Sequence, residues 1–362
     1  MVEIMTEDIV FSHVPEAIGG EVSGVETLRH NVGNAATGGI WRVRGTTGSA
    51  VLKLASPPSA PRTRPASWPT SDQPAHWNYW QRELLAYQTG LADSAYRDAG
   101  IRAPAVLEVN PRADGVIELW LDDIAGAPGF DWDVPRLARF AYELGAGQAR
   151  WAGRVPETEW LSRRWLAQYF DEHPSRSVDV RSADWDHPRA AAWPAGVRRD
   201  LERLWVDRLR VLAVAESTER TLCHLDVWPA NLVDDGGTSV LLDWSFVGEG
   251  AIGEDLANLI LDSCSDGLMD IALLPEIAEM AADGYINGLR DGGWSGSEDR
   301  VRLATAACGA AKYSWFGPTV LQRAVRDSLG KSSYGQDGSA TEALERLTGL
   351  VTLIAQWATS VL

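Results

Sequence analysis

The stretch that most constrains the fold is "CHLDVWPANLVDDGGTSVLLDW", residues 223–244. Two short apolar runs flank the turn "DDGGTS", a pattern typical of a β-hairpin. The hairpin places Asn231 before its first strand and Asp243 at the end of its second, and antiparallel pairing brings those two ends together. Asp226 precedes Asn231 in the loop that leads into the hairpin. We therefore expect two carboxylates and one carboxamide to converge in a small volume.

Phosphoryl transfer is a chemistry that needs this set of side chains. Asn231 and Asp243 supply the oxygen ligands that Mg²⁺ prefers, and water and phosphate oxygens can complete its shell. Asp226 is then available to accept the proton of an attacking hydroxyl, and Pro229 stiffens the loop between base and ligand. This arrangement matches the kinase catalytic loop with its metal-binding Asp. We interpret His224 as a structural residue that hydrogen-bonds the backbone of the site.

The second predicted part of the site depends on lysine. Only three of the 33 Lys and Arg residues are lysines, and Lys53 lies inside the apolar strand "AVLKLA" at 50–55. A buried ammonium needs partners, and triphosphate oxygens with one carboxylate would satisfy it. Glu83, on the helix that follows, is the candidate carboxylate. The loop "GNAATGG", ending in Gly38 and Gly39, is a weaker candidate for covering the phosphates, since it does not match the pattern GxGxxG.

Composition excludes several other classes of protein. A chain of 362 residues is expected to form two lobes. Its formal net charge of −17 argues against nucleic acid and anionic membranes as partners. No signal peptide is indicated, and no run of about 18 apolar residues could span a membrane. The three Cys are widely spaced, so we expect reduced, buried thiols in a cytoplasmic protein.

The pattern along the chain predicts a small β-rich lobe followed by a large helical lobe. Strands are expected up to 123, interrupted by a mobile or extended Pro-rich insertion at 56–75 and by one helix at 76–91. Beyond 129 the only expected strands are 221–223, 230–234 and 239–243. Helices are predicted at 134–152, 158–173, 196–215, 252–265, 272–291, 298–315, 317–329 and 339–361.

These residues resemble the aminoglycoside phosphotransferase family, within the wider group of kinases that includes choline kinase. "HLDVWPAN" is similar to the family's catalytic loop H-x-D-x-x-P-x-N, and "VLLDW" to its metal-binding strand. "GEGAIGEDLANLI" resembles the stretch that follows, in which an Asp, here Asp255, braces the catalytic loop. "ELWLDDIAG" at 118–126 resembles the interlobe hinge, which implies adenine contacts by the backbones of Asp122 and Ile124.

The resemblance implies an α+β, two-lobed, protein-kinase-like fold. Its expected parts are a nucleotide-binding N-lobe at 1–121, a hinge at 122–126, and a helical C-lobe at 127–362 that carries the catalytic loop and the acceptor site. The cofactors implied are ATP and Mg²⁺. The likeness is strong over about 221–260 and weaker elsewhere, and the insertion at 56–75 departs from the compact family pattern.

The leading hypothesis is an ATP- and Mg²⁺-dependent phosphotransferase that acts on a hydroxyl of a small molecule, such as an aminoglycoside, an amino sugar or a related amine-bearing natural product. Asp262, Asp266 and Asp270 follow the motif and could line an acidic pocket for an amine, although a solvated helix end is the favoured interpretation of all three. A second hypothesis is a kinase that phosphorylates Ser or Thr of a peptide. A third is a catalytically inactive kinase-like binding module.

Overall fold

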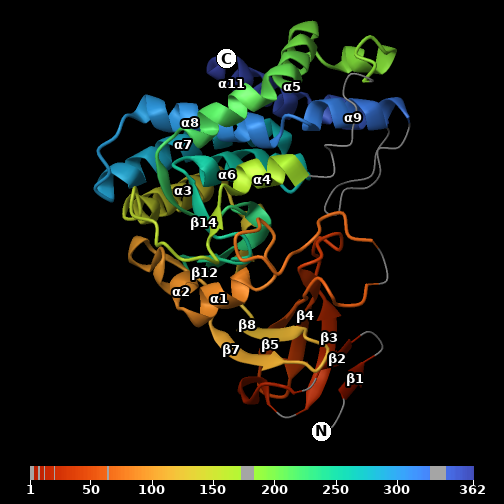
Figure 1. The fold of residues 1–362 in the computed structure, drawn as a ribbon, viewed down its shortest axis with the longest axis vertical. Coiled ribbons are helices and arrows are strands. Elements are labelled where there is room, and N and C mark those ends of the chain that lie inside the picture. The colour runs from red at the N-terminus through yellow and green to blue at the C-terminus, as the bar shows by residue number, and fades with distance from the viewer. Residues whose placement is uncertain are drawn as a thin grey trace.

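The N-terminal lobe is built on a five-stranded antiparallel sheet (Figure 1). The computed structural model describes residues 4–6, 9–11, 13–19, 21–62, 65–172, 183–326 and 340–362. In spatial order the sheet holds β3 (Val22–Thr27), β4 (Thr37–Gly45), β5 (Ser49–Ala55), β8 (Ile117–Asp122) and β7 (Val106–Pro111). A separate hairpin joins β1 (Ile4–Thr6) to β2 (Ile9–Phe11).

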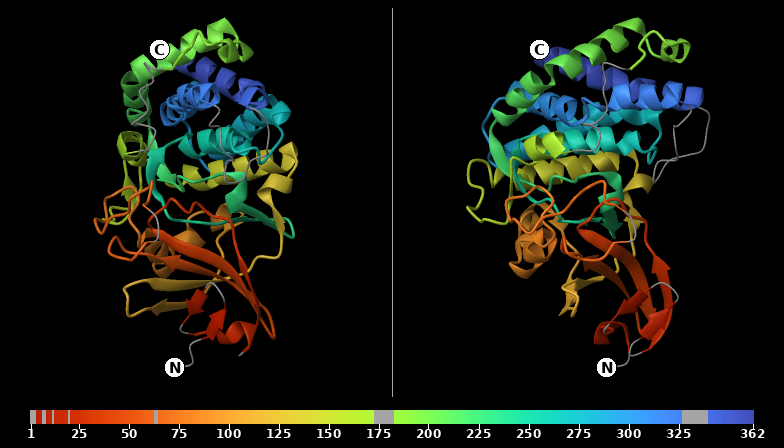
Figure 2. Two further views of the ribbon diagram at one scale, coloured as in Figure 1. Left: turned by 90° about the vertical axis from the view of Figure 1, so that its right-hand side faces the viewer. Right: turned by 45° about the vertical axis from the view of Figure 1, so that its right-hand side comes forward.

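Alternation along β5 decides which way Lys53 points. Leu52 and Leu54 enter a small core on one face of the sheet, together with Trp41 and Trp120. Because successive side chains of a strand point to opposite faces, Lys53 is directed to the other face. That face meets α1 (Arg82–Gln88) and the C-terminal lobe, which Figure 2 shows directly above the sheet.

The helix predicted at 76–91 is shorter than expected. Residues 76–81 form turns, α1 begins at Arg82, and α2 (Leu91–Ser94) follows. The fully buried guanidinium of Arg82 donates hydrogen bonds to the backbone carbonyls of Pro74, His76 and Trp77 at 2.6–3.0 Å. Carbonyls that point to a buried Arg are not available to a helix, so the turns replace the first helical residues.

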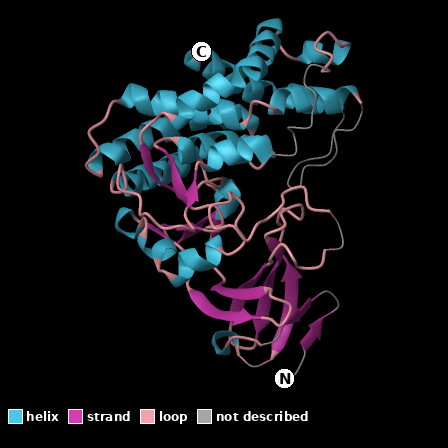
Figure 3. Ribbon diagram, viewed as in Figure 1, coloured by secondary structure: helices cyan, strands magenta, loops and turns pink. Residues whose placement is uncertain are grey.

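The C-terminal lobe is largely helical, as predicted (Figure 3). The helix predicted at 158–173 begins only at Trp165, and the one predicted at 339–361 is divided in two. Positions 173, 327–329 and 339 of the predicted helices lie outside the described residues. The helices are α3 (Val134–Ala149), α4 (Trp165–Glu172), α5 (Ala195–Glu216), α6 (Glu254–Ser265), α7 (Leu274–Asp291), α8 (Glu298–Lys312), α9 (Phe316–Val325), α10 (Ala340–Arg346) and α11 (Thr348–Val361).

Two small sheets lie where the lobes meet. One has the order β6 (Ile101–Arg102), β13 (Thr238–Leu241), β12 (Leu232–Asp235), β9 (Ala127–Pro128). The other has β14 (Gly248–Ala251) between β10 (Ser162–Arg163) and β11 (Arg220–Cys223). β12 and β13 are the predicted hairpin, and Gly236 and Gly237 take φ of 58° and 90° in its turn. Positive φ at both central residues is the geometry of the turns that fit hairpin twist.

Helices α3 and α7 approach each other so closely that their contact depends on glycine. A Cβ on Gly145 would lie 2.2 Å from the carbonyl oxygen of Tyr285, and a Cβ on Gly288 would lie 2.0 Å from that of Tyr142. This packing matters for the site because α3 also carries Gln148, which is fully buried beneath the catalytic loop. No helix in the described ranges is long and apolar enough to cross a membrane.

Candidate functional site

The catalytic loop, residues 224–231, is held at its start by one buried carboxylate. Asp255, in the first turn of α6, accepts hydrogen bonds from the backbone N–H groups of His224 and Leu225, each at 2.7 Å. Leu225 has φ of +69°, a conformation that a non-Gly residue adopts only when its surroundings impose it. Burial raises the pKa of Asp255 to about 6, against the lowering effect of these hydrogen bonds. The structure thus places Asp255 where the resemblance expected a brace.

A second layer of buried polar groups supports Asp255. Gln148 donates to its Oδ2 at 2.7 Å, and the hydroxyl of Tyr285 on α7 donates to Gln148 Oε1. The Tyr285 hydroxyl in turn accepts the N–H of Gly253 at 3.1 Å. Sequence reasoning missed Gln148 and Tyr285, because no motif marks them and only helix packing brings them under the loop.

His224 is placed as a structural residue. Its ring is fully buried, lies edge-on to Trp244 at 5.0 Å, and accepts the backbone N–H of Asp226 at 3.3 Å. Burial lowers the pKa of His224 to about 4, so the ring is neutral near pH 7. A neutral ring that accepts a backbone hydrogen bond can orient the loop, and the structural role interpreted from sequence stays a prediction.

Asp226 and Asn231 face each other across the loop. The amide nitrogen of Asn231 donates to both the backbone carbonyl and the Oδ2 of Asp226, each at 2.9 Å. This turns the amide so that its oxygen is left for another partner. Burial, followed by the charge of Asp243, raises the pKa of Asp226 to about 7.

Asp243 directly follows the hairpin and takes the left-handed conformation, with φ of +57°. Its Oδ1 accepts a hydrogen bond from Lys53 Nζ at 2.8 Å and another from the Ser245 hydroxyl. Burial raises the pKa of Asp243, but the charge and hydrogen bond of Lys53 outweigh it and lower the pKa. The carboxylate, which is 31% exposed, is therefore ionised beside Asp226.

Lys53 and Glu83 form the pair that sequence suggested, with 2.6 Å between Nζ and Oε2. Both side chains are buried, at 8% and 9% exposure. Burial lowers the pKa of Lys53, yet Asp243 and Glu83 together raise it above its ordinary value. The ammonium therefore remains charged between one carboxylate from each lobe. Ser245, whose hydroxyl lies within hydrogen-bonding distance of both carboxylates, was not singled out from sequence.

The predicted phosphate loop requires a correction. Gly38 and Gly39 lie within β4 rather than in a loop. The backbone N–H groups of residues 33–36, the turn before it, already donate to oxygens of Asn31, Asn34 and Trp68. No free row of N–H groups remains in that turn for phosphates, since the turn is locked by its own side chains and by the insertion.

The Pro-rich insertion at 56–75 is also more ordered than expected in its described residues. Trp68 exchanges backbone hydrogen bonds with Gly33 and Ala35 in the N-terminal lobe, at 3.0 and 2.9 Å. Its ring packs edge-on against Trp77 and Tyr169, with centroids 5.5 and 5.7 Å apart. Tyr169 belongs to α4, so the insertion connects the turn at residues 33–36 to the C-terminal lobe.

Of the proposed hinge residues, Asp122 ends β8 and Ile124 lies between β8 and β9, where the chain passes from one lobe to the other. The backbone N–H of Asp122 already donates to the carbonyl of Ala105 at 2.9 Å, and its carboxylate accepts the N–H of Ala105. A nucleobase at this position would have to use the carbonyl of Asp122, together with the backbone of Ile124.

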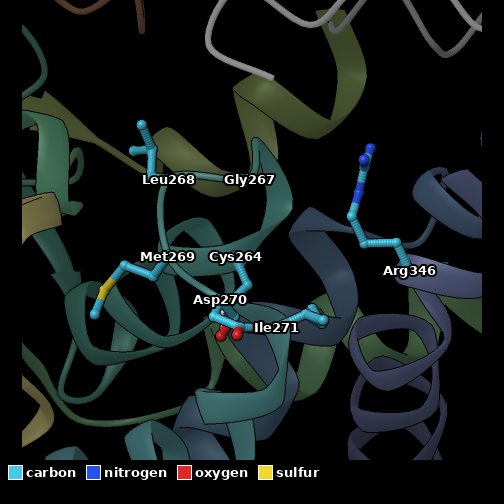
Figure 4. A pocket seen from close by; sticks show the side chains of 7 residues that line it. All are labelled: Cys264, Gly267, Leu268, Met269, Asp270, Ile271 and Arg346. Carbon is cyan, nitrogen blue, oxygen red and sulfur yellow. Dashed lines mark hydrogen bonds between the residues drawn. The ribbon is translucent and has the colours of Figure 1, made fainter. Parts of the chain in front are cut away.

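The acidic residues that follow the motif do not form a simple anionic pocket. Asp262 pairs with Lys312 at 3.1 Å, and burial with the charge of Asp262 raises the pKa of Asp266 to about 6. Asp270 caps a short helical turn by accepting the N–H of Ala272 at 2.9 Å. It lines a separate pocket of about 330 Å³ with Cys264 and neighbouring residues, and Arg346 lies across that pocket (Figure 4).

The donor set fits a hard divalent cation. Within the described part of the chain, Asn231 Oδ1 and Asp243 Oδ2 accept no hydrogen bond, so each has an oxygen left for a metal. Among the same residues, no group of three or more His, Cys, Asp or Glu side chains could hold a metal ion. Two protein oxygens with phosphate and water are the usual set for Mg²⁺.

A sheet lobe and a helical lobe, with Lys53, Glu83 and Asp243 joined between them, define a two-lobed protein-kinase-like fold. The chain belongs to the phosphotransferase enzyme family, whose sequence model matches residues 40–296. Membership confirms the predicted family and enzyme class.

Several solved structures are similar to this chain. Amicoumacin kinase hAmiN, in complex with AMP-PNP, Ca²⁺ and Ami, is 10% identical, with a TM-score of 0.49 over 92% of this chain and 87% of that one. Aminoglycoside phosphotransferase from Alicyclobacillus acidocaldarius is 16% identical, with a TM-score of 0.49 and coverage of 92% and 91%. Choline kinase LicA from Streptococcus pneumoniae is 13% identical, with a TM-score of 0.48 and coverage of 92% and 94%. No curated protein sequence matches the chain.

Proposed function

We propose that this protein is an ATP- and Mg²⁺-dependent kinase that transfers the γ-phosphoryl group of ATP to a hydroxyl of a small molecule. The observation that carries the proposal is the position of Lys53. Its ammonium is held between Glu83 at 2.6 Å and Asp243 at 2.8 Å, and Asp243 lies beside Asp226. A cation, a metal-binding carboxylate and a base thus meet between the two lobes.

Each residue has one step in this mechanism. Lys53 binds the α- and β-phosphate oxygens, and Glu83 fixes its direction. Asp226 orients the acceptor hydroxyl toward the phosphorus and takes its proton as the new O–P bond forms. Asp255 and Gln148 act through the backbone of the loop, because they hold His224 and Leu225 in place.

Asn231 and Asp243 are the residues that would hold Mg²⁺, each through the oxygen that accepts no hydrogen bond from the described residues. When bound, the ion neutralises charge on the phosphate oxygens during transfer. The chain then contributes mainly positioning and fixed charge, which are the chief sources of rate in phosphoryl transfer.

An acceptor screen tests the proposal. Wild-type protein and Asp226→Ala are incubated with Mg·ATP and aminoglycosides, amino alcohols or sugars, and phosphorylated product is measured together with ADP. We expect transfer by the wild type and a loss of about 10²–10⁴-fold in the variant, the usual contribution of a positioned base. ATP binding by the variant should be nearly intact. Undiminished transfer by Asp226→Ala would show that Asp226 is not the base.

A further inference from the structure

Lysine is scarce in this chain. Of the three lysines, Lys53 pairs with Glu83 and Asp243, Lys331 lies outside the described residues, and Lys312 ends α8. The Lys312 side chain is 10% exposed, nearly as buried as that of Lys53. Lys312 is therefore, like Lys53, a scarce and buried ammonium that needs anionic or polar partners.

Lys312 is linked to the catalytic loop through one face of α6. Its Nζ donates to Asn258 Oδ1 at 2.9 Å and to Asp262 Oδ2 at 3.1 Å. The amide nitrogen of Asn258 donates to the carbonyl of Leu225 at 3.3 Å, next to Asp226. Asp255, Asn258 and Asp262 are spaced three and four residues apart, so one helix face carries the brace of the loop and both partners of Lys312.

The Lys312–Asn258–Leu225 link brings this cluster close to Asp226. The Asp226 carboxyl feels the charge of Lys312, which lowers its pKa against the larger effects of burial and of Asp243. The charges of Asp262 and Asp226 both raise the pKa of the Tyr169 hydroxyl, after the larger effect of burial. Lys312 and Asp262 therefore lie near enough to Asp226 to meet a substituent of the hydroxyl that Asp226 orients.

Lys312 has a donor to spare at this place. An ammonium has three N–H groups, and among the described residues two of them are used, by Asn258 and Asp262. The rings of Trp165 and Tyr313 lie 5.5 Å from Nζ and offer only their π-faces. A buried donor of this kind is expected to bind an oxygen when a ligand arrives.

The pairing of charges restricts which ligand group fits. An ammonium next to the reacting hydroxyl has no acceptor for the spare N–H of Lys312, and a carboxylate there would be repelled by Asp262 and Asp226. A neutral hydroxyl accepts from an N–H and donates to a carboxylate at the same time. It satisfies both members of the Lys312–Asp262 pair without adding charge.

We infer that the Lys312–Asp262 pair is an acceptor-recognition element, and that the acceptor carries a neutral hydroxyl on the carbon next to the one that is phosphorylated. The acceptor class is then a vicinal diol, as in polyols, cyclitols and sugars, and any amine of the acceptor lies farther from the reacting hydroxyl. This inference rests on the proposed kinase function and adds the group that Lys312 recognises.

A set of matched probes tests it. The compounds trans-1,2-cyclohexanediol, cyclohexanol, trans-2-aminocyclohexanol and trans-2-hydroxycyclohexanecarboxylate share a ring and a reacting hydroxyl and differ only in the neighbouring group. Phosphoryl transfer to each is measured with labelled ATP. A hydrogen bond to a charged donor changes kcat/KM by about 10–150-fold. We expect the diol to exceed the other three probes by that factor in the wild type.

The variants Lys312→Met and Lys312→Gln should lower the preference for the diol over cyclohexanol to near one. Lys312→Gln keeps N–H donors for Asn258 and Asp262, so a result shared by both variants does not reflect an unfolded loop. The matched control is Arg302→Met, which removes an exposed cation and its ion pair from the same helix and should keep the wild-type ratio.

Three results would overturn the inference: a diol no better than cyclohexanol, a preference for the amine or carboxylate probe, or an unchanged preference in both Lys312 variants. A wild-type protein that neither hydrolyses ATP nor phosphorylates any probe would count against the kinase proposal instead. The two failures are therefore distinguishable.

Discussion

The contact between α3 and α7 allows a sharp prediction for Gly288→Ala. The added Cβ would lie 2.0 Å from the carbonyl oxygen of Tyr142, 2.8 Å from its carbonyl carbon and 2.9 Å from the nitrogen of Ala146. All three atoms are backbone, so no side chain can move aside. Ordinary contact begins at 3.4 Å, and the helices must therefore separate locally by 3.4 − 2.0 = 1.4 Å.

The free energy of unfolding should fall in this variant despite the better helix propensity of Ala. Replacing Gly by Ala inside a helix contributes up to about 1 kcal/mol. Forcing an extra group into a packed contact costs about 1–3 kcal/mol and occasionally more, and a clash between two backbones belongs at the upper end. The net loss is about 2 kcal/mol, which corresponds to roughly 3 °C in Tm for a chain of 362 residues, because the unfolding entropy is about 2.1 cal/mol/K per residue.

Thermal unfolding and turnover are measured on Gly288→Ala and on Gly196→Ala. The control residue lies in the first turn of α5, and its added Cβ would come no closer than 3.8 Å to the Arg199 guanidinium. We expect the control to equal or exceed the wild type in Tm. We expect Gly288→Ala to lose turnover as well, because Tyr285, which supports Gln148, lies one turn away. A Gly288→Ala protein as stable as the control would refute the reasoning.

Two further changes test other parts of the structure. Trp68→Ala removes ring contacts with Trp77 and Tyr169, so we expect a loss of about 1–3 kcal/mol, seen as a lower Tm and faster proteolysis within 56–75; an unchanged Tm would mean that the insertion does not tie the lobes together. Burial raises the pKa of Glu254 from 4.5 to about 7, so the stability due to its protonation is present below pH 4.5 and is lost as the pH rises to 7. Glu254→Gln should therefore be more stable than the wild type by about 1–3 kcal/mol at pH 8 but not at pH 4.5, as judged by Tm. A stability difference between variant and wild type that is the same at both pH values would contradict this prediction.

Sequence was informative wherever the site is local along the chain. The hairpin that carries Asp243 could be predicted because Gly236 and Gly237 mark its turn. Lys53 could be predicted because lysine is scarce in this chain. The same scarcity also marks Lys312, but its partners lie about 50 residues away on α6, and nothing in a single sequence connects the two helices.

Contacts that depend on packing could not be predicted in this way. Proline content suggested a mobile insertion, whereas backbone hydrogen bonds of Trp68 to Gly33 and Ala35 and the packing of its ring against α4 hold the insertion in place. Helical periodicity suggested a helix from 76, whereas the buried Arg82 donates hydrogen bonds to the backbone carbonyls of that segment. In both cases a tertiary contact overrides a local preference. The hydrogen bond from Gln148 to Asp255 is likewise a tertiary contact that no local pattern predicts.

The central claim is that Asp243 and Asn231 bind a divalent ion beside the nucleotide while Asp226 acts on the acceptor. Calorimetric titration of the ATP analogue AMP-PNP, with and without Mg²⁺, into the wild type, Asp226→Ala and Asp243→Ala tests it most directly. We expect Mg²⁺ to tighten binding in the wild type and in Asp226→Ala, and to have little effect in Asp243→Ala. The same gain from Mg²⁺ in all three proteins would contradict the claim.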